Sequence, residues 1–157
     1  SSVTPTPDRT VDVPNRERPL SERGHQQAAA LVPLLKTLNI SAVYSSAFQR
    51  TLDTVRPFCV FADLSPIERE DLRESADKTP LDDVTDQMIG AVTSIVRGHG
   101  SENVLICTHG GCVWCTLRHF TEFHYEDYKR IRNPDMFRLV NNGGKLSLDE
   151  DFVFEIA

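Results

Sequence analysis

The stretch Val104-Leu105-Ile106-Cys107-Thr108-His109-Gly110-Gly111 is the most informative part of this sequence. Its first four residues form a continuous β-favouring run, which predicts a strand buried on both faces. The glycines allow a tight turn and a close backbone approach, and residues 112–120 predict a helix. His109 is therefore expected where a parallel strand ends and a helix begins, a position at which α/β proteins bind anions. We interpret His109 as a candidate phosphate-binding residue; the alternative is a histidine that only satisfies a strand-end carbonyl group.

Helices and strands are expected to alternate before this stretch. Ser21 is a suitable N-cap for a helix over residues 22–38, although Pro33 predicts a kink or a later start. A short strand over residues 42–46 leads into a second amphipathic helix, and residues 63–80 are predicted to form an acidic loop. A third helix follows, and the residues that mark its apolar face are Val84, Met88, Val92 and Ile95.

A hairpin is expected near the end of the sequence. Residues 136–141 and 145–148 flank Asn142-Gly143-Gly144, a typical turn sequence, and residues 152–156 predict a last strand. Because strands alternate with helices along the chain, we predict an α/β fold. This fold is a three-layer sandwich, with a mostly parallel sheet covered by helices on both faces.

The composition is that of one soluble domain over residues 1–157. Hydrophobic residues make up 39% and charged residues 25%, and the formal net charge of −6 argues against nucleic acid or anionic membranes as general partners. No apolar run approaches the roughly 18 residues of a membrane span, and residues 1–7 do not resemble a signal peptide. The four cysteines are unevenly spaced, so we expect a cytoplasmic protein without a disulfide scaffold.

Three motifs follow one another in a specific order. Pro19–Ala28 (PLSERGHQQA) opens the first helix, Val43–Thr51 (VYSSAFQRT) crosses from a strand into the second helix, and Val104–Gly111 (VLICTHGG) comes last. Together they resemble the histidine phosphatase superfamily, the phosphoglycerate mutase-like proteins, from about Arg18 to about His119. The resemblance implies the phosphoglycerate mutase-like version of the α/β sandwich.

The resemblance also implies residues that bind the phosphate. Arg50 matches the arginine that holds the substrate phosphate, and Gly110 is assigned to the same phosphate site. His109 matches the second active-site histidine, which contacts the transferring phosphoryl group. Arginine and histidine suit phosphate binding, because an arginine offers two parallel N–H donors and a histidine adds a further N–H donor.

The expected proton donor lies in the acidic segment. Leu72-Arg73-Glu74 resembles the segment that carries the family's acid/base glutamate, which makes Glu74 the expected donor to the leaving oxygen. Asp71 and Glu70 are nearby alternatives. Nothing in this set of residues demands a metal ion or another cofactor.

The family's nucleophile has no counterpart in the sequence. It is a histidine in an Arg-His-Gly sequence that ends the first strand, and these 157 residues contain no Arg-His-Gly. His25 follows Pro19–Gly24, a segment that lies downstream of the nucleophile in the family, and residues 1–20 do not resemble a buried strand. Two interpretations remain. Either a first strand with the nucleophile lies upstream of Ser1, or the protein is a non-catalytic relative that binds a phosphate ligand or a protein partner.

We expect phosphomonoester hydrolysis through a phosphohistidine intermediate, with a small phosphorylated substrate. A phosphatase is preferred to a mutase because the short chain lacks loops that would enclose a bisphosphorylated sugar acid. The sequence leaves the substrate's identity and the oligomeric state open. A distant alternative is a zinc or thiol protein, since Cys112, Cys115 and His119 share one helical face. Cysteines on an apolar face are more often packing residues.

Overall fold

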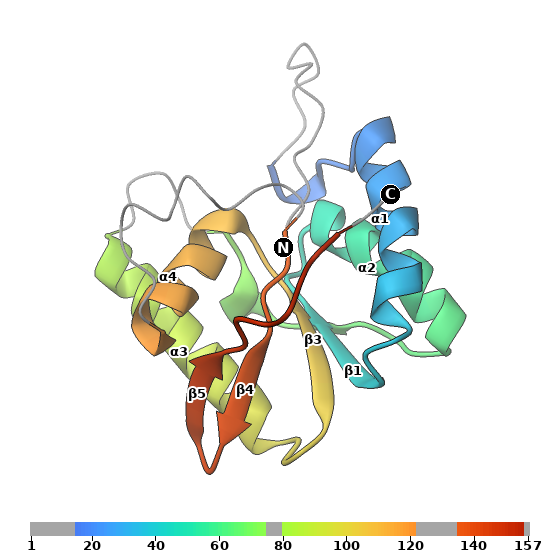
Figure 1. The fold of residues 1–157 in the computed structure, drawn as a ribbon. Helices are drawn as coiled ribbons and strands as arrows, with labels where there is room; N and C mark the ends of the chain where they lie inside the picture. The colour runs from blue at the N-terminus through green and yellow to red at the C-terminus, as the bar shows by residue number, and fades with distance from the viewer. Residues whose placement is uncertain (1–14, 75–79, 122–134, 156–157) are drawn as a thin grey trace.

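The computed structural model describes residues 15–74, 80–121 and 135–155, and a parallel sheet lies at its centre (Figure 1). The strands of this sheet are β1 (Ile40–Ser45), β2 (Ile67–Glu68) and β3 (Asn103–Cys107), in the order β2-β1-β3. β1 is parallel to both neighbours, and Tyr44 lies in register with Ile67 on one side and Ile106 on the other.

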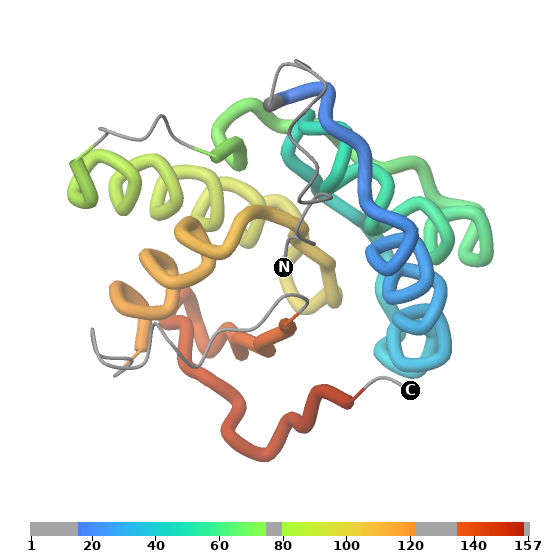
Figure 2. The backbone as a smooth tube through the Cα atoms, turned by 90° about the horizontal axis from the view of Figure 1, so that it is seen from above, coloured from blue at the N-terminus to red at the C-terminus, as the bar shows by residue number. Residues whose placement is uncertain are grey.

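Helices cover both faces of the sheet (Figure 2). The helices are α1 (Glu22–Leu35), α2 (Gln49–Ala62), α3 (Leu81–Arg97) and α4 (Gly110–Phe120), with short 3-10 helices η1 (Asn15–Glu17) and η2 (Glu70–Leu72). A separate antiparallel hairpin consists of β4 (Leu139–Asn142) and β5 (Lys145–Leu148). In the described part of the chain, no helix is both long and apolar enough to cross a membrane.

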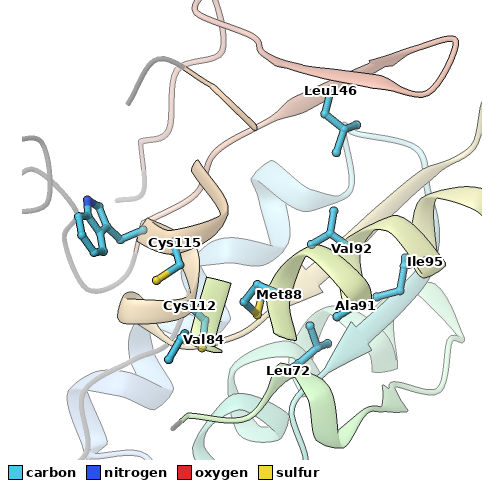
Figure 3. Packing of buried hydrophobic residues seen from close by; sticks show 10 residues of the cluster. Leu72, Val84, Met88, Ala91, Val92, Ile95, Cys112, Cys115 and Leu146 are labelled. Atoms are coloured by element: carbon cyan, nitrogen blue, oxygen red, sulfur yellow. The ribbon is translucent and has the colours of Figure 1, made fainter. Parts of the chain in front are cut away.

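Two hydrophobic cores lie on opposite faces of the sheet, because side chains alternate along a strand. Val43 and Cys107 belong to the core formed with α1 and α2, whereas Tyr44 and Ile106 pack against the core of α3 and α4. Figure 3 shows the second core, in which Met88 of α3 lies near Cys112 of α4. The predicted three-layer α/β fold, with a parallel sheet between helices, is confirmed.

Several predicted elements are confirmed in detail. Ser21 caps α1, since its Oγ accepts a hydrogen bond from the Gly24 backbone N–H at 3.0 Å. Pro33 lies in the last turn of α1, which ends at Leu35 rather than at residue 38. The turn of the β4–β5 hairpin has positive φ at Gly143 and Gly144, 63° and 95°, as the glycine-rich sequence predicts.

Three expectations are wrong for physical reasons. The predicted loop over residues 63–80 contains β2 and η2 in its described part, because two strand residues leave no periodic pattern and depend on pairing with β1. Residues 152–155 form no strand, since they pair with no neighbouring strand in the described chain; residue 156 lies outside it. The run Val104–Ile106 is only half-buried, because β3 lies at an edge of the sheet.

Candidate active site

The carboxyl ends of β1 and β3 bring two segments together. Ser45 and Cys107 are in register at the ends of their strands, so Ser46 and His109, which follow, leave the sheet at the same edge. α2 begins at Gln49 and α4 at Gly110, just beyond these residues. Two helix N-termini therefore lie at one edge, where their unpaired N–H groups favour an anion.

Arg50 lies in the first turn of α2 and is 4% exposed. Its Nη2 donates a hydrogen bond to Glu74 Oε2 and lies 3.5 Å from His109 Nδ1, while its guanidinium carbon is 5.0 Å from the centre of the Phe48 ring. Burial lowers the pKa of Arg50, and the negative charge of Glu74 partly opposes this shift. An arginine remains charged in such surroundings, so the site holds a buried positive charge.

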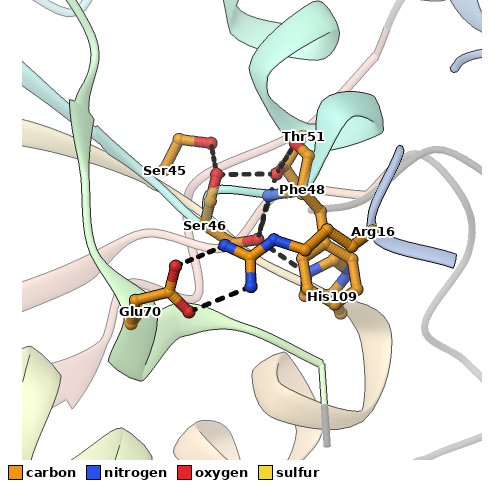
Figure 4. A network of polar contacts seen from close by, with 7 residues as sticks. All are labelled: Arg16, Ser45, Ser46, Phe48, Thr51, Glu70 and His109. Carbon is orange, nitrogen blue, oxygen red and sulfur yellow. Dashed lines mark hydrogen bonds and ion pairs between the residues drawn. The ribbon is translucent and has the colours of Figure 1, made fainter. Parts of the chain in front are cut away.

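His109 is held by a hydrogen-bond network around Ser46 (Figure 4). The distance between His109 Nε2 and Ser46 Oγ is 3.0 Å, and His109 is only 2% exposed. Ser46 Oγ also accepts a hydrogen bond from the Phe48 backbone N–H at 3.1 Å and one from Thr51 Oγ1 at 3.2 Å. The Phe48 ring meets the imidazole edge-on, with 4.9 Å between ring centres.

The charge of His109 follows from its surroundings. Burial, and secondarily the charge of Arg50, lowers the pKa of His109 to about 3, so the ring is neutral at pH 7. Arg50 can only donate, which favours a lone pair on the facing Nδ1 and the proton on Nε2. In this tautomer Nε2–H donates to Ser46 Oγ, and Nδ1 is directed toward the arginine.

Glu74 is positioned by the segment that precedes it. Leu72 is fully buried in the core of α3 and α4, and its carbonyl accepts a hydrogen bond from Thr108 Oγ1 at 2.6 Å. The Arg73 carbonyl accepts one from Gln87 Nε2 at 3.3 Å. These anchors hold the chain so that the Glu74 side chain, 44% exposed, reaches the buried Arg50.

The two alternative acids pair with other residues. Asp71 forms a salt bridge with Arg69 at 2.6 Å, and Glu70 pairs with Arg16. Of the three acids considered from the sequence, Glu74 is the one that contacts Arg50. The structure therefore brings together Arg50, His109 and Glu74; their catalytic roles remain predictions.

Gly110 and Gly111 do not form the tight turn expected from the sequence. Neither has a positive φ, so the backbone makes no turn that requires glycine. A Cβ atom built on either residue would meet no atom within 4 Å. The space in front of Gly110, at the N-terminus of α4, is therefore open, and a ligand can approach the backbone there.

From the sequence alone, Ser46 and Phe48 have no role in the site; Phe48 is expected only on the apolar face of the second helix. Both belong to the Val43–Thr51 motif, but the histidine that they contact is about sixty residues away in the sequence. Hydrophobic periodicity gives no information about such a contact. The order of the three motifs was the only available signal.

The zinc alternative has no geometric support in the residues that the structure describes. No three His, Cys, Asp or Glu side chains are grouped there as metal ligands. Cys112 and Cys115 are buried in the core of α3 and α4, whereas His119 is exposed. Burial raises the pKa of Cys112 to about 11, which opposes formation of the thiolate that binds zinc.

Comparisons with known proteins agree with the fold. Among solved structures, YhfR from Bacillus stearothermophilus has a TM-score of 0.72 and 22% identity, covering 84% of this chain and 83% of its own. A phosphoserine phosphatase mutant from Entamoeba histolytica, in complex with phosphoserine, has a TM-score of 0.73 and 14% identity, with 85% and 84% covered. A mycobacterial glucosyl-3-phosphoglycerate phosphatase has a TM-score of 0.73 and 16% identity, with 86% and 88% covered. At these identities the likeness shows the fold.

The sequence comparisons give the family. No curated protein matches the chain. The sequence model of the histidine phosphatase superfamily (branch 1) matches residues 10–78 and 75–145, which together make up most of the chain. The protein belongs to the histidine phosphatase superfamily.

Proposed function

We propose that the protein is a metal-independent phosphomonoesterase that acts through a phosphohistidine intermediate. The described residues supply its phosphate-binding site. The observation that carries the proposal is the convergence of Arg50, His109 and Glu74 at an edge with two helix N-termini. A small phosphorylated substrate fits this arrangement, and related folds include phosphatases for phosphoserine and glucosyl-3-phosphoglycerate.

Arg50 and His109 bind the phosphoryl group in this proposal. The guanidinium donates hydrogen bonds to two phosphate oxygens, which requires it to share or release Glu74. A phosphate dianion next to His109 raises the pKa of the imidazole, so that Nδ1 takes up a proton and donates to a third oxygen. Gly110 leaves room for the anion to reach the backbone at the start of α4.

Glu74 transfers the proton. In the first step a histidine nitrogen attacks phosphorus, a P–N bond forms, the ester P–O bond breaks, and the Glu74 carboxyl group protonates the leaving oxygen. In the second step water attacks the phosphohistidine, Glu74 accepts the water's proton, and inorganic phosphate and free histidine result. The half-exposed position of Glu74 suits exchange of protons with solvent.

The nucleophilic histidine is expected upstream of Ser1. His109 does not suit this role, because its Nε2 is bonded to Ser46 and its Nδ1 faces a cation. A reducing compartment such as the cytoplasm suits the protein, because its four cysteines are free and buried.

A second candidate function is phosphate or partner binding without turnover. It is favoured by the surroundings of His109, whose two ring nitrogens face Ser46 and Arg50, so that this histidine does not suit attack on a phosphorus atom held by Arg50. The two candidates share the phosphate site and differ only in chemistry, so one set of measurements separates them.

The test begins with phosphate binding. We expect inorganic phosphate to bind the chain and Arg50→Ala to weaken binding at least a hundredfold, because a preorganised buried charge is lost. Arg50→Lys should recover little, since an ammonium group cannot donate in parallel to two oxygens. Arg56→Ala is the matched control: Arg56 is an exposed arginine of α2, paired with Asp53 at 3.8 Å, and its loss should leave binding unchanged. Equal binding in the wild type and Arg50→Ala would contradict the site.

The chemical step needs a separate measurement on the full-length protein. We expect hydrolysis of an aryl phosphate with a chelator present, and an acid-labile, base-stable phosphoenzyme after rapid quenching. Phosphate binding without either signal would favour the non-catalytic candidate. Activity that is lost with a chelator and restored by zinc would contradict metal independence.

A further inference from the structure

The carbonyl groups of residues 71–73, which lead to Glu74, all accept hydrogen bonds from side chains of other elements. Gln87 Nε2, on α3, donates to the first of them at 2.9 Å and to the third at 3.3 Å. Thr108 Oγ1 donates to the second at 2.6 Å, and Cys112 Sγ, on α4, donates to the third at 3.4 Å. We refer to residues 71–74 as the Glu74 segment. Side chains from both α3 and α4 therefore fix its backbone.

Thr108 connects the Glu74 segment with the phosphate site. It lies between the end of β3 and the start of α4, directly before His109, and it is 3% exposed. Its acceptor belongs to Leu72, which is fully buried in the core of α3 and α4 (Figure 3). Because Thr108 and His109 are consecutive, one short stretch of chain holds both the imidazole and the Glu74 segment.

This connection matters most when a substrate is bound. In the empty site Arg50 donates a hydrogen bond to the Glu74 carboxylate. In the proposed reaction the donors of Arg50 turn to phosphate oxygens, so this hold on the carboxylate weakens. The hydrogen bonds to the carbonyls of residues 71–73 do not involve Arg50 and persist. They keep the carboxyl group near the leaving oxygen, where a misplacement of about 1 Å can slow a reaction about a hundredfold.

We propose that Thr108 is a positioning residue of the reaction. Its hydroxyl group fixes the Glu74 segment to the stretch that carries His109, and so sets where the proton donor stands relative to the bound phosphate. Gln87 is a second anchor, which acts on the same segment from α3. The effect on proton transfer rests on the proposed function, whereas the anchoring rests on the hydrogen bonds alone.

Four variants isolate the hydroxyl group. Thr108→Val removes it with little change in shape, and Thr108→Ser keeps it. Thr116→Val is the matched control, because Thr116 is also buried and donates to a carbonyl at 2.8 Å, but within α4. Gln87→Met removes the second anchor at a half-buried position of α3, and it serves as the test if Thr108→Val does not fold.

The first measurement is kcat/KM of the full-length protein with two aryl phosphates. Phenyl phosphate needs a proton on its leaving oxygen, whereas 2,4-dinitrophenyl phosphate releases a stable phenolate without one. With phenyl phosphate, Thr108→Val should lower kcat/KM at least about tenfold, because the proton donor is misplaced. With 2,4-dinitrophenyl phosphate it should change little. Gln87→Met should show the same difference between the substrates.

The remaining variants exclude a merely structural role. Thr108→Ser and Thr116→Val should resemble the wild type with both substrates. An equal loss with both substrates in Thr108→Val would overturn the proposal, since it would mark a general disturbance of the site. So would a loss of phosphate affinity in Thr108→Val as large as that in Arg50→Ala, because Thr108 would then act on phosphate binding through His109.

The second measurement is amide hydrogen exchange of the 157-residue chain, which needs no turnover. The backbone N–H groups of Leu72 and Arg73 donate to the carbonyls of Arg69 and Glu70, both at 3.2 Å. Thr108→Val should speed exchange of these two amides about tenfold, because the Leu72 carbonyl loses a buried hydrogen bond. Unchanged exchange would overturn the proposal.

Together the two measurements separate this proposal from the proposed function. If the wild type hydrolyses neither substrate and Thr108→Val speeds exchange, the anchoring is supported and the phosphatase is contradicted. If the wild type hydrolyses both substrates and Thr108→Val affects them equally, the phosphatase is supported and the positioning role of Thr108 is overturned.

Discussion

The two edges of β3 differ in strand pairing within the described residues. Along one edge, β3 pairs with β1 as far as Ser45 and Cys107, and this pairing continues into the network of Ser46 and His109. Along the other edge, β3 borders an apolar cavity. The comparison shows that Arg50 and His109 come together through the paired edge, because Arg50 follows β1 and His109 follows β3.

Buried hydrogen bonds hold the paired edge together. Ser45 and Ser46 have no exposed surface, and the Ser46 carbonyl accepts hydrogen bonds from Ser45 Oγ at 2.8 Å and Thr51 Oγ1 at 3.0 Å. Buried polar groups of this kind are costly to separate, since each unsatisfied one costs roughly 1–3 kcal/mol. No comparable buried side-chain network borders the other edge of β3 in the part of the chain that the structure describes.

The largest expected effect is the loss of folding stability in acid. It arises from His109, at the paired edge of β3. His109 has a pKa of about 3 in the folded protein and about 6.5 when unfolded, so between these values the unfolded chain binds more protons. The stabilisation is fully present above pH 6.5 and is lost as the pH falls toward 3, by about 1.4 kcal/mol per pH unit. Between pH 7 and pH 5, urea unfolding should show a loss of about 2 kcal/mol that His109 causes.

Replacement of His109 isolates this contribution. His109→Gln keeps polar groups toward Ser46 and Arg50 but does not titrate, so this part of the acid loss should disappear. His119→Gln, at an exposed histidine of α4, should retain the loss. The same fall in stability in His109→Gln and wild type would mean that other groups cause it.

The next largest effect is the loss of stability when a valine is shortened to alanine, which we compare between a fully buried strand position and one beside the cavity. Val43 of β1 has no exposed surface, whereas Val104 of β3 is half-buried beside the cavity. Val43→Ala should lower the free energy of unfolding by about 2 kcal/mol, and Val104→Ala by about 1 kcal/mol, because less apolar area is lost at the open edge. Equal costs for the two variants would mean that Val104 is as well packed as Val43 and that the second edge of β3 is covered.

The sequence predicts those parts of the fold that depend on local patterns. The apolar face of α3 recurs at helical spacing, and Asn142-Gly143-Gly144 provides the positive φ angles of the hairpin, so both are recognisable without a structure. β2 and the absence of a strand at 152–155 depend on pairing with distant strands. Such pairing leaves no trace in a short segment.

The same distinction holds for the candidate site. Arg50, Glu74 and His109 were predicted because they lie in motifs whose order resembles a family, and the structure brings them together. The support that Ser46 and Gln87 provide was not predicted, because each acts through a hydrogen bond to a distant segment. The half-buried state of β3 was also missed, since an apolar run does not reveal whether both neighbouring strands are present.

The smallest effect concerns two glycines. A Cβ atom would meet no atom within 4 Å at Gly110, in the first turn of α4, or at Gly90, within α3. Each glycine-to-alanine change should raise the free energy of unfolding by about 0.5 kcal/mol, because alanine reduces the entropy of the unfolded chain.

Phosphate affinity should distinguish the two variants. The new methyl group of Gly110→Ala occupies the open space before α4, whereas the methyl group of Gly90→Ala lies elsewhere, within α3. We expect a several-fold loss by calorimetry for Gly110→Ala and none for Gly90→Ala. Unchanged affinity in Gly110→Ala would show that the anion binds through Arg50 and His109 without approaching the backbone of α4.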